Sequence, residues 1–134
     1  MIEHTLDVRS AEFAAAPGAA PRLPGELARA VIGALAGPPI LTIAPQIWSE
    51  AAVEPAIREV LSGLFTRMMV MLRAELTAWA ASHPEHVGGD PAVWAASITP
   101  VLYSVVPGYI LQRIMITDFD DRAYLETLTT AFAH

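Results

Sequence analysis

The residues whose types and spacing favour metal chemistry lie together in one short stretch. His83 and His86 are three positions apart, and acidic residues lie close by. Two imidazoles on one helical turn can hold a divalent ion such as Zn²⁺, but a structural zinc site requires about four protein ligands. Pro84 and the pair Gly88-Gly89 also disfavour a helix at this point. The pattern therefore favours a solvated loop, and we expect no metal ligands.

Nucleophilic catalysis requires a nucleophile beside a base, and a third group that orients the base. The chain has no cysteine, and its serines and histidines form no such arrangement. The acidic runs at 118–121 and 50–59 are typical of helix caps and solvated faces, not of paired catalytic acids. We therefore expect a binding or structural protein, with no catalytic residues and no cofactor.

The elements that must position any binding residues are helices. Apolar residues recur with helical spacing along most of the chain, and no segment shows strand periodicity. We expect a helix from Pro24 to the Gly37-Pro38-Pro39 break, a second one kinked or restarted at Pro45, a long one over 54–82, one over 91–116, and a last one after Asp120. Residues 1–22 are predicted to be an irregular segment or linker, and 23–134 one all-α domain, an antiparallel bundle of about five to six helices.

An apolar pocket is expected between the helices at 54–82 and 91–116. The side chains that can line it are apolar or aromatic: Phe65, Met68, Met69, Leu72, Trp94, Ile98 and Tyr103. Methionine suits a pocket that must adapt to its ligand. Taken one by one, the same residues are also consistent with ordinary core packing.

Composition and charge limit the partners of the chain. Its eight basic residues are all arginines, scattered along the sequence, and the net charge is −6. Without a basic stripe, the chain alone is not expected to bind nucleic acid. The hydrophobic fraction of 54% and the mean hydropathy of +0.43 indicate more apolar side chains than an ordinary core holds. A partner subunit, a ligand cavity or a bilayer must cover the rest of this apolar surface. No signal peptide is evident at the N-terminus, so we expect a cytoplasmic protein.

Two uncharged runs make a membrane protein the alternative to a soluble bundle. They lie between Arg29 and Glu50 and between Asp90 and Arg113, and each is long enough to cross a bilayer. Prolines interrupt both runs, and the helix between them carries charges within its apolar pattern. No Lys/Arg asymmetry between loops sets a topology. We therefore prefer the soluble bundle.

Several motifs carry a family resemblance. The segment PQIWSEAAVEPAIRE at 45–59 resembles the W-x-E-A-x-x-x-P-x-[IL]-R region of the C-terminal domains of TetR-family transcriptional regulators. Asp90-Pro91 with Ala95, the run at 107–113, and Asp118-Phe119-Asp120 are similar to the penultimate helix of that family and the start of its last helix. The resemblance covers about residues 24–133, and its motifs are loose.

The resemblance implies an N-terminal three-helix DNA-binding unit, a ligand pocket among the C-terminal helices, and a homodimer. Residues 1–22 are too few for that DNA-binding unit. We therefore expect an effector-binding and homodimerisation domain without a DNA reader, with a small apolar ligand. A purely structural dimerisation protein is the alternative.

The resemblance places the dimer on the last two helices, and the residues supply a physical reason. The helix at 91–116 is uncharged up to Gln112, so one face can meet its own domain and another a partner. Small residues at 104 and 108 allow two helices to approach closely. The predicted interface, a four-helix bundle shared by two copies, consists of Ser104, Gly108, Gln112, Tyr124, Leu128 and Phe132.

Overall fold

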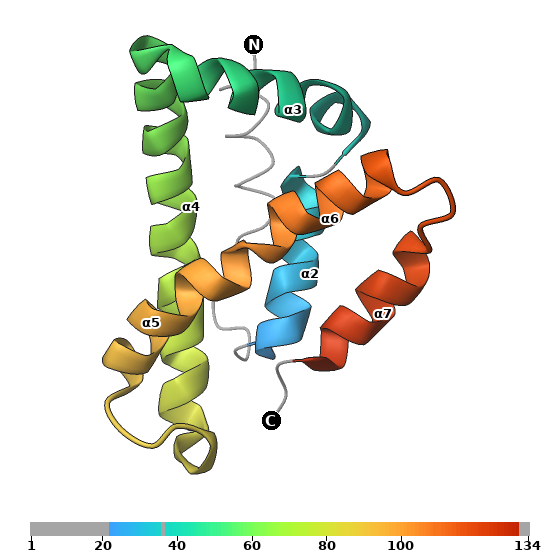
Figure 1. Ribbon diagram of the computed structural model, residues 1–134. Coiled ribbons are helices and arrows are strands. Elements are labelled where there is room, and N and C mark those ends of the chain that lie inside the picture. Colours follow the sequence, from blue (N-terminus) through green and yellow to red (C-terminus); the bar gives the residue numbers. More distant parts are fainter. Residues whose placement is uncertain (1–21, 36, 132–134) are drawn as a thin grey trace.

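The computed structural model describes residues 22–35 and 37–131, and it confirms the all-α prediction: this part of the chain contains helices and no strand (Figure 1). The predicted interface residue Phe132 and residues 1–21 of the predicted linker (1–22) lie outside the described residues. The elements are α2 (Pro24–Leu35), α3 (Pro38–Val53), α4 (Pro55–Ser82), a single 3₁₀ turn η1 (Pro84–His86), α5 (Pro91–Tyr103), α6 (Val105–Met115) and α7 (Asp121–Ala131).

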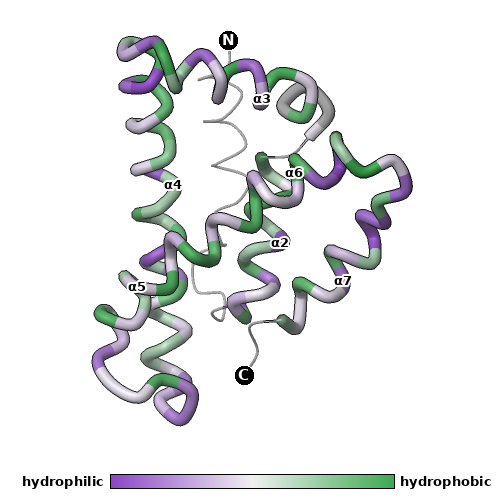
Figure 2. Tube along the Cα trace, viewed as in Figure 1, coloured by the Kyte–Doolittle hydropathy of each residue, from purple (hydrophilic) through white to green (hydrophobic). Residues whose placement is uncertain are grey.

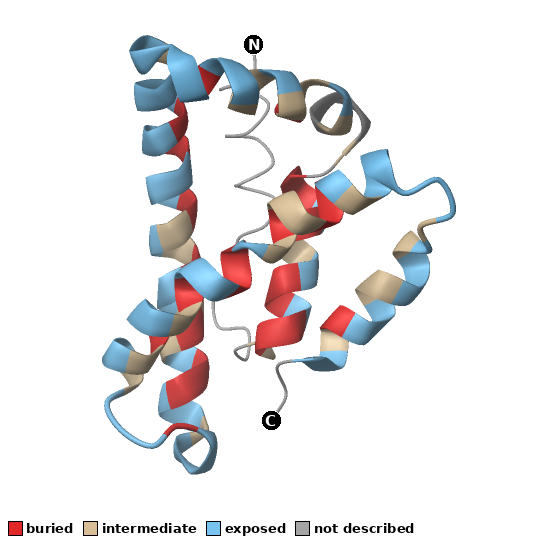
Figure 3. Ribbon diagram, in the orientation of Figure 1, coloured by how far each residue is buried: buried red, intermediate tan, exposed pale blue. Residues whose placement is uncertain are grey.

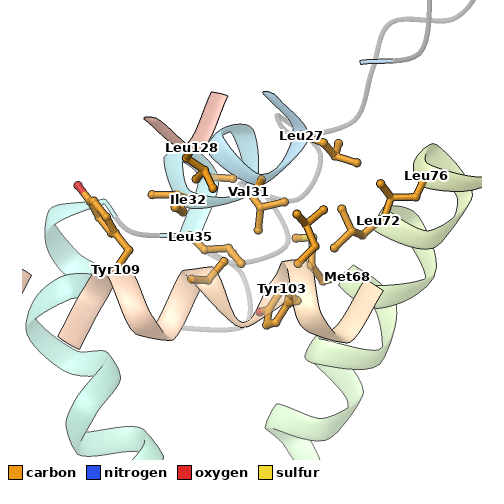
Figure 4. Close-up of a cluster of buried hydrophobic side chains, with 14 of the residues drawn as sticks. Leu27, Val31, Ile32, Leu35, Met68, Leu72, Leu76, Tyr103, Tyr109 and Leu128 are labelled. Atoms are coloured by element: carbon orange, nitrogen blue, oxygen red, sulfur yellow. The ribbon is translucent and has the colours of Figure 1, made fainter. Parts of the chain in front are cut away.

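Helix α2 lies at the centre of the fold. It contacts α4, α5, α6 and α7, whereas α3 packs on α4 (Figure 1). In Figure 3 the buried residues of α4 lie on the side of that helix that faces the rest of the protein, while its opposite side is exposed. Leu27 and Val31 of α2 meet Leu72 and Leu76 of α4 in the main core (Figure 4), and each of these residues is 0% or 1% exposed. Full burial of such a side chain contributes about 1.5–3 kcal/mol to the free energy of unfolding.

The helices begin where proline and capping residues predict. Glu54 accepts a hydrogen bond from the backbone N–H of Ala56 at 3.3 Å, and Asp90 accepts one from Ala92 at 2.8 Å. Proline occupies the first turn of both helices. Asp120 caps α7 in the same way, through the N–H of Ala123 at 3.0 Å. Side-chain oxygens thus replace the partners that the first N–H groups of a helix lack.

Two prolines behave differently from the sequence-based expectation. Pro45 neither ends nor restarts a helix, because α3 runs through it from Pro38 to Val53. The expected single helix over 91–116 is instead divided at Ser104. Pro107 explains this break: it has no N–H for the carbonyl of Tyr103, and its ring crowds that carbonyl. The Ser104 N–H turns to the carbonyls of Pro100 and Val101, both at 3.2 Å.

Helices α2 and α7 approach each other closely at Gly25. A Cβ atom added to Gly25 would lie only 2.5 Å from the carbonyl oxygen of Thr129 and would also overlap the carbonyl of Leu128. The Arg29 guanidinium donates to the Thr129 hydroxyl at 3.4 Å across the same contact. Glycine at position 25 therefore allows α7 to lie directly on α2.

Substituting this glycine should separate the two helices. We expect Gly25→Ala to lower the free energy of unfolding by about 3 kcal/mol, because backbone atoms of α7 cannot yield as a flexible side chain would. Gly33→Ala is the matched control on the same helix, since a Cβ there meets nothing within 4 Å. It should raise stability by about 0.5–1 kcal/mol. Urea denaturation followed by circular dichroism measures both, and equal effects would contradict the close contact.

Candidate ligand-binding groove

An open groove of about 700 Å³ lies between α3, α4 and α5. Most of its surface is apolar, with a few polar groups at intervals. Its lining residues are Trp48, Ala51, Arg58, Leu61, Ser62, Phe65, Thr66, Met69, Val70, Arg73, Ala96, Thr99 and Pro100.

Each wall of the groove has a distinct character. On α4, the lining residues from 58 to 73 recur every three or four positions, which places them along one side of that helix. The α5 wall consists of small or compact side chains, and the Thr99 hydroxyl donates to the Ala95 carbonyl at 2.6 Å, so its polar atom is already satisfied. Trp48 and Ala51 of α3 form the remaining wall.

The structure divides the predicted pocket residues between groove and core. Phe65 and Met69 line the groove. Met68 and Leu72 are 3% and 0% exposed and belong to the main core (Figure 4). Successive residues on a helix point about 100° apart, so adjacent methionines at 68 and 69 face different surroundings.

The three remaining predicted residues lie against the core. Trp94 and Ile98 are half-buried beside it. Tyr103 is buried, and its ring centroid lies 5.7 Å from that of Phe65 in a tilted arrangement. Tyr103 therefore does not line the groove itself but packs against Phe65, which does.

The burial of Tyr103 predicts a pH dependence. Desolvation raises the pKa of its hydroxyl from 10.0 to about 12. The folded state keeps this proton where the unfolded chain loses it, so the associated stability is fully present below pH 10 and lost as the pH rises to about 12. Two pKa units correspond to about 2–3 kcal/mol. Tyr103→Phe has no hydroxyl to titrate. Chemical denaturation at pH 9, 10.5 and 11.5 should therefore show that its free energy of unfolding falls less steeply with pH than that of the wild type. Parallel losses would contradict the buried hydroxyl.

The two arginines of the groove, Arg58 and Arg73, were not among the predicted pocket residues. Arg58 donates through Nε to the carbonyl of Ala51 at 3.0 Å and through a terminal nitrogen to that of Ala52 at 3.1 Å. It thereby satisfies carbonyls at the C-terminal end of α3. The Arg73 side chain is exposed, and within the described ranges its guanidinium has no hydrogen-bond or ion-pair partner. The recurrence of polar residues at 58, 62, 66 and 73 was the signal in the sequence for this polar margin.

Some of the predicted interface residues lie at the protein surface, and others pack inside the protein. Ser104 is exposed and Gly108 faces open space, while Gln112 is half-buried and its amide donates to the Gly108 carbonyl at 3.3 Å. Tyr124 packs within its own chain, where its ring centroid lies 5.4 Å from that of Tyr109. Leu128 is 5% exposed and belongs to the core beside α2 (Figure 4).

Exposed apolar residues form a stripe along α5 and α6. Val93, Val101, Leu111 and Met115 are 69%, 56%, 47% and 75% exposed. Together with Ser97, Ser104 and Gly108 they recur every three or four positions, so they share one helical face. Figure 2 shows the repeated apolar segments of α5 and α6. We call these seven residues the α5–α6 stripe.

The histidines pack on tryptophan. The His83 ring stacks on Trp79 with centroids 4.5 Å apart, and its Nδ1 lies 2.8 Å from the Trp79 carbonyl oxygen. His86 is 5.8 Å from the same indole, in the η1 turn. In the part of the chain that the structure describes, no group of three or more potential ligands could hold a metal ion.

No family model, no curated protein and no solved structure matches this chain. The TetR-like resemblance thus stays a prediction from the sequence motifs. One segment of the described chain, Pro91–Met115, is long and apolar enough to cross a membrane by length and composition, and 39% of its most apolar window is buried within the protein.

Proposed function

We propose that the chain is a small-molecule-binding and homodimerising domain of the TetR-like type, without DNA-binding activity of its own. The observation that carries the proposal is the groove of about 700 Å³ between α3, α4 and α5. Ligand sites commonly have volumes of about 300–1,000 Å³ and combine an apolar lining with a few polar groups. The groove has both properties.

A ligand in this groove would contact three helices at once. Trp48 lies on α3, Phe65 and Met69 on α4, and Pro100 on α5. A ligand that binds one arrangement of these helices better than another shifts the population toward that arrangement. Since α5 continues into α6, such a shift would also move the α5–α6 stripe. Effector binding and dimer geometry are thereby linked.

A second copy of the chain is the proposed cover of the α5–α6 stripe. The chain carries a net charge of −6, yet no charged residue occurs from Pro91 to Gln112. Two copies can therefore meet on this face without repulsion between their acidic surfaces, and an isologous dimer brings the same face together twice. Ser104 and Gly108 would let the helices approach closely. The exposed side of α7 is mostly polar, so it would contribute less to the contact than α5 and α6.

Ligand binding is tested by filling the groove. A panel of apolar compounds should raise the melting temperature of the wild type, because a ligand that binds only the folded state stabilises it. Ala96→Trp places a large ring in the groove from an exposed position on α5 and should abolish the shift without unfolding the protein. Ala78→Trp, at an exposed position of α4 outside the groove, should leave it intact. If no compound stabilises the wild type, a purely structural dimer is favoured.

The dimer is tested with two glycines that both face open space, Gly108 on α6 and Gly63 on α4. Gly108→Arg places a charge in the proposed contact and should convert a dimer into monomers in sedimentation velocity. Gly63→Arg adds the same charge at an exposed position of α4, outside the α5–α6 stripe, and should leave the dimer unchanged. A folded wild-type monomer would contradict the proposal. A chain that remains in solution only with detergent would indicate that a bilayer covers the stripe.

A further inference from the structure

We infer that the groove selects amphipathic anions, whose apolar body lies along α4 and whose carboxylate pairs with Arg73. This inference deepens the proposed ligand-binding function and rests on it. It names the chemical class of the ligand and the residue that recognises its charged end.

The lining of the groove is positively charged, although the chain as a whole is negative. The chain has 14 acidic and 8 basic residues. The lining reverses this balance, because it contains Arg58 and Arg73 and no aspartate or glutamate. A concave surface lined with one sign of charge concentrates ligands of the opposite sign. An anion is therefore favoured over a cation in this groove, although the protein as a whole is negative.

The two arginines of the groove differ in whether their guanidinium groups already have hydrogen-bond partners. Arg58 already donates to the carbonyls of Ala51 and Ala52, at 3.0 and 3.1 Å. Two of its five N–H donors are thus committed to holding α3. Arg73 has no such partner among the described residues. The planar guanidinium offers two parallel N–H groups, a geometry that matches a carboxylate. The charged end of the ligand therefore belongs at Arg73.

Along α4, apolar lining residues lie between the two arginines. Fifteen positions separate Arg58 from Arg73, or about 22 Å at 1.5 Å per residue. Phe65 and Met69 lie between them, with the Thr66 hydroxyl on the same stretch of α4. A ligand held at Arg73 would extend its apolar body over Met69 and Phe65 toward Trp48. A carboxylate on a linear chain or a fused ring system has this shape and polarity.

The experiment compares three ligands of one chain length by isothermal titration calorimetry: decanoate, decanol and decylamine, each below its micelle-forming concentration. The wild type should bind decanoate about fivefold more tightly than decanol, a modest preference because Arg73 is solvent-exposed. Decylamine should bind most weakly. Decanol measures the apolar groove alone, and the ratio of the two affinities measures the contribution of the charge.

Variants assign the preference to one residue. Arg73→Gln should lower decanoate affinity about fivefold and leave decanol binding unchanged. Arg73→Lys should give an intermediate value, because it keeps the charge and loses the paired N–H groups. The control is Arg122→Gln, which removes the same charge from an exposed position on α7, a helix that does not line the groove. It should bind all three ligands as the wild type does.

Two results would overturn the inference while leaving ligand binding in place. One is equal affinity of the wild type for decanoate and decanol. The other is an equal loss of decanoate affinity in Arg73→Gln and Arg122→Gln, which would reflect net charge alone. Failure of all three compounds to bind would instead contradict the proposed ligand-binding function, and the inference would fall with it.

Discussion

The burial of α2 among four other helices is the constraint on which the rest of this fold depends. Leu27 and Val31 are almost completely buried against α4, and Gly25 brings the backbone of α7 into direct contact on the other side. With α2 in place, α4 and α5–α6 are held at fixed positions around it. The groove lies on the side of α4 that α2 does not use. Part of its lining still packs in the protein, because Ala51 and Leu61 are buried in a small cluster, whereas the exposed residues such as Phe65 and Arg73 are left to form the open surface of the groove.

The positions of most helices could be predicted from the sequence, because their ends are set by local chemistry. Asp90-Pro91 and Glu54-Pro55 both satisfy free N–H groups within a few residues, so no knowledge of distant contacts is required. Pro107 has a local effect too, but the sequence also contains Pro45 and Pro100, and the helix continues through both. The presence of a proline therefore did not by itself identify the position at which a helix is interrupted.

The candidate groove could be predicted only in part. The predicted walls α4 and α5 both border the groove, and of the predicted residues Phe65 and Met69 line it. The division between Met68 in the core and Met69 in the groove depends on how α4 is rotated relative to α2. Neither residue type nor spacing fixes that rotation, because the middle of α4 is apolar on nearly every side. The wall from α3 was missed for a similar reason, since the angle between α3 and α4 is set by contacts distant in sequence.

The C-terminal end of α3 is attached to α4 through a small apolar cluster and two hydrogen bonds from Arg58. Ala51 shares a small cluster with Leu61 and Leu64 that is distinct from the main core, and Arg58 ties the last carbonyls of α3 to α4. Regions with few buried apolar contacts open locally at a free energy below that of global unfolding. The amide hydrogens around this end of α3 should thus exchange with solvent through a subglobal opening while α2 and α4 remain protected. Because Trp48 and Ala51 line the groove, each opening also removes part of its wall, and a ligand bound there, as we propose, would slow exchange at this end of α3.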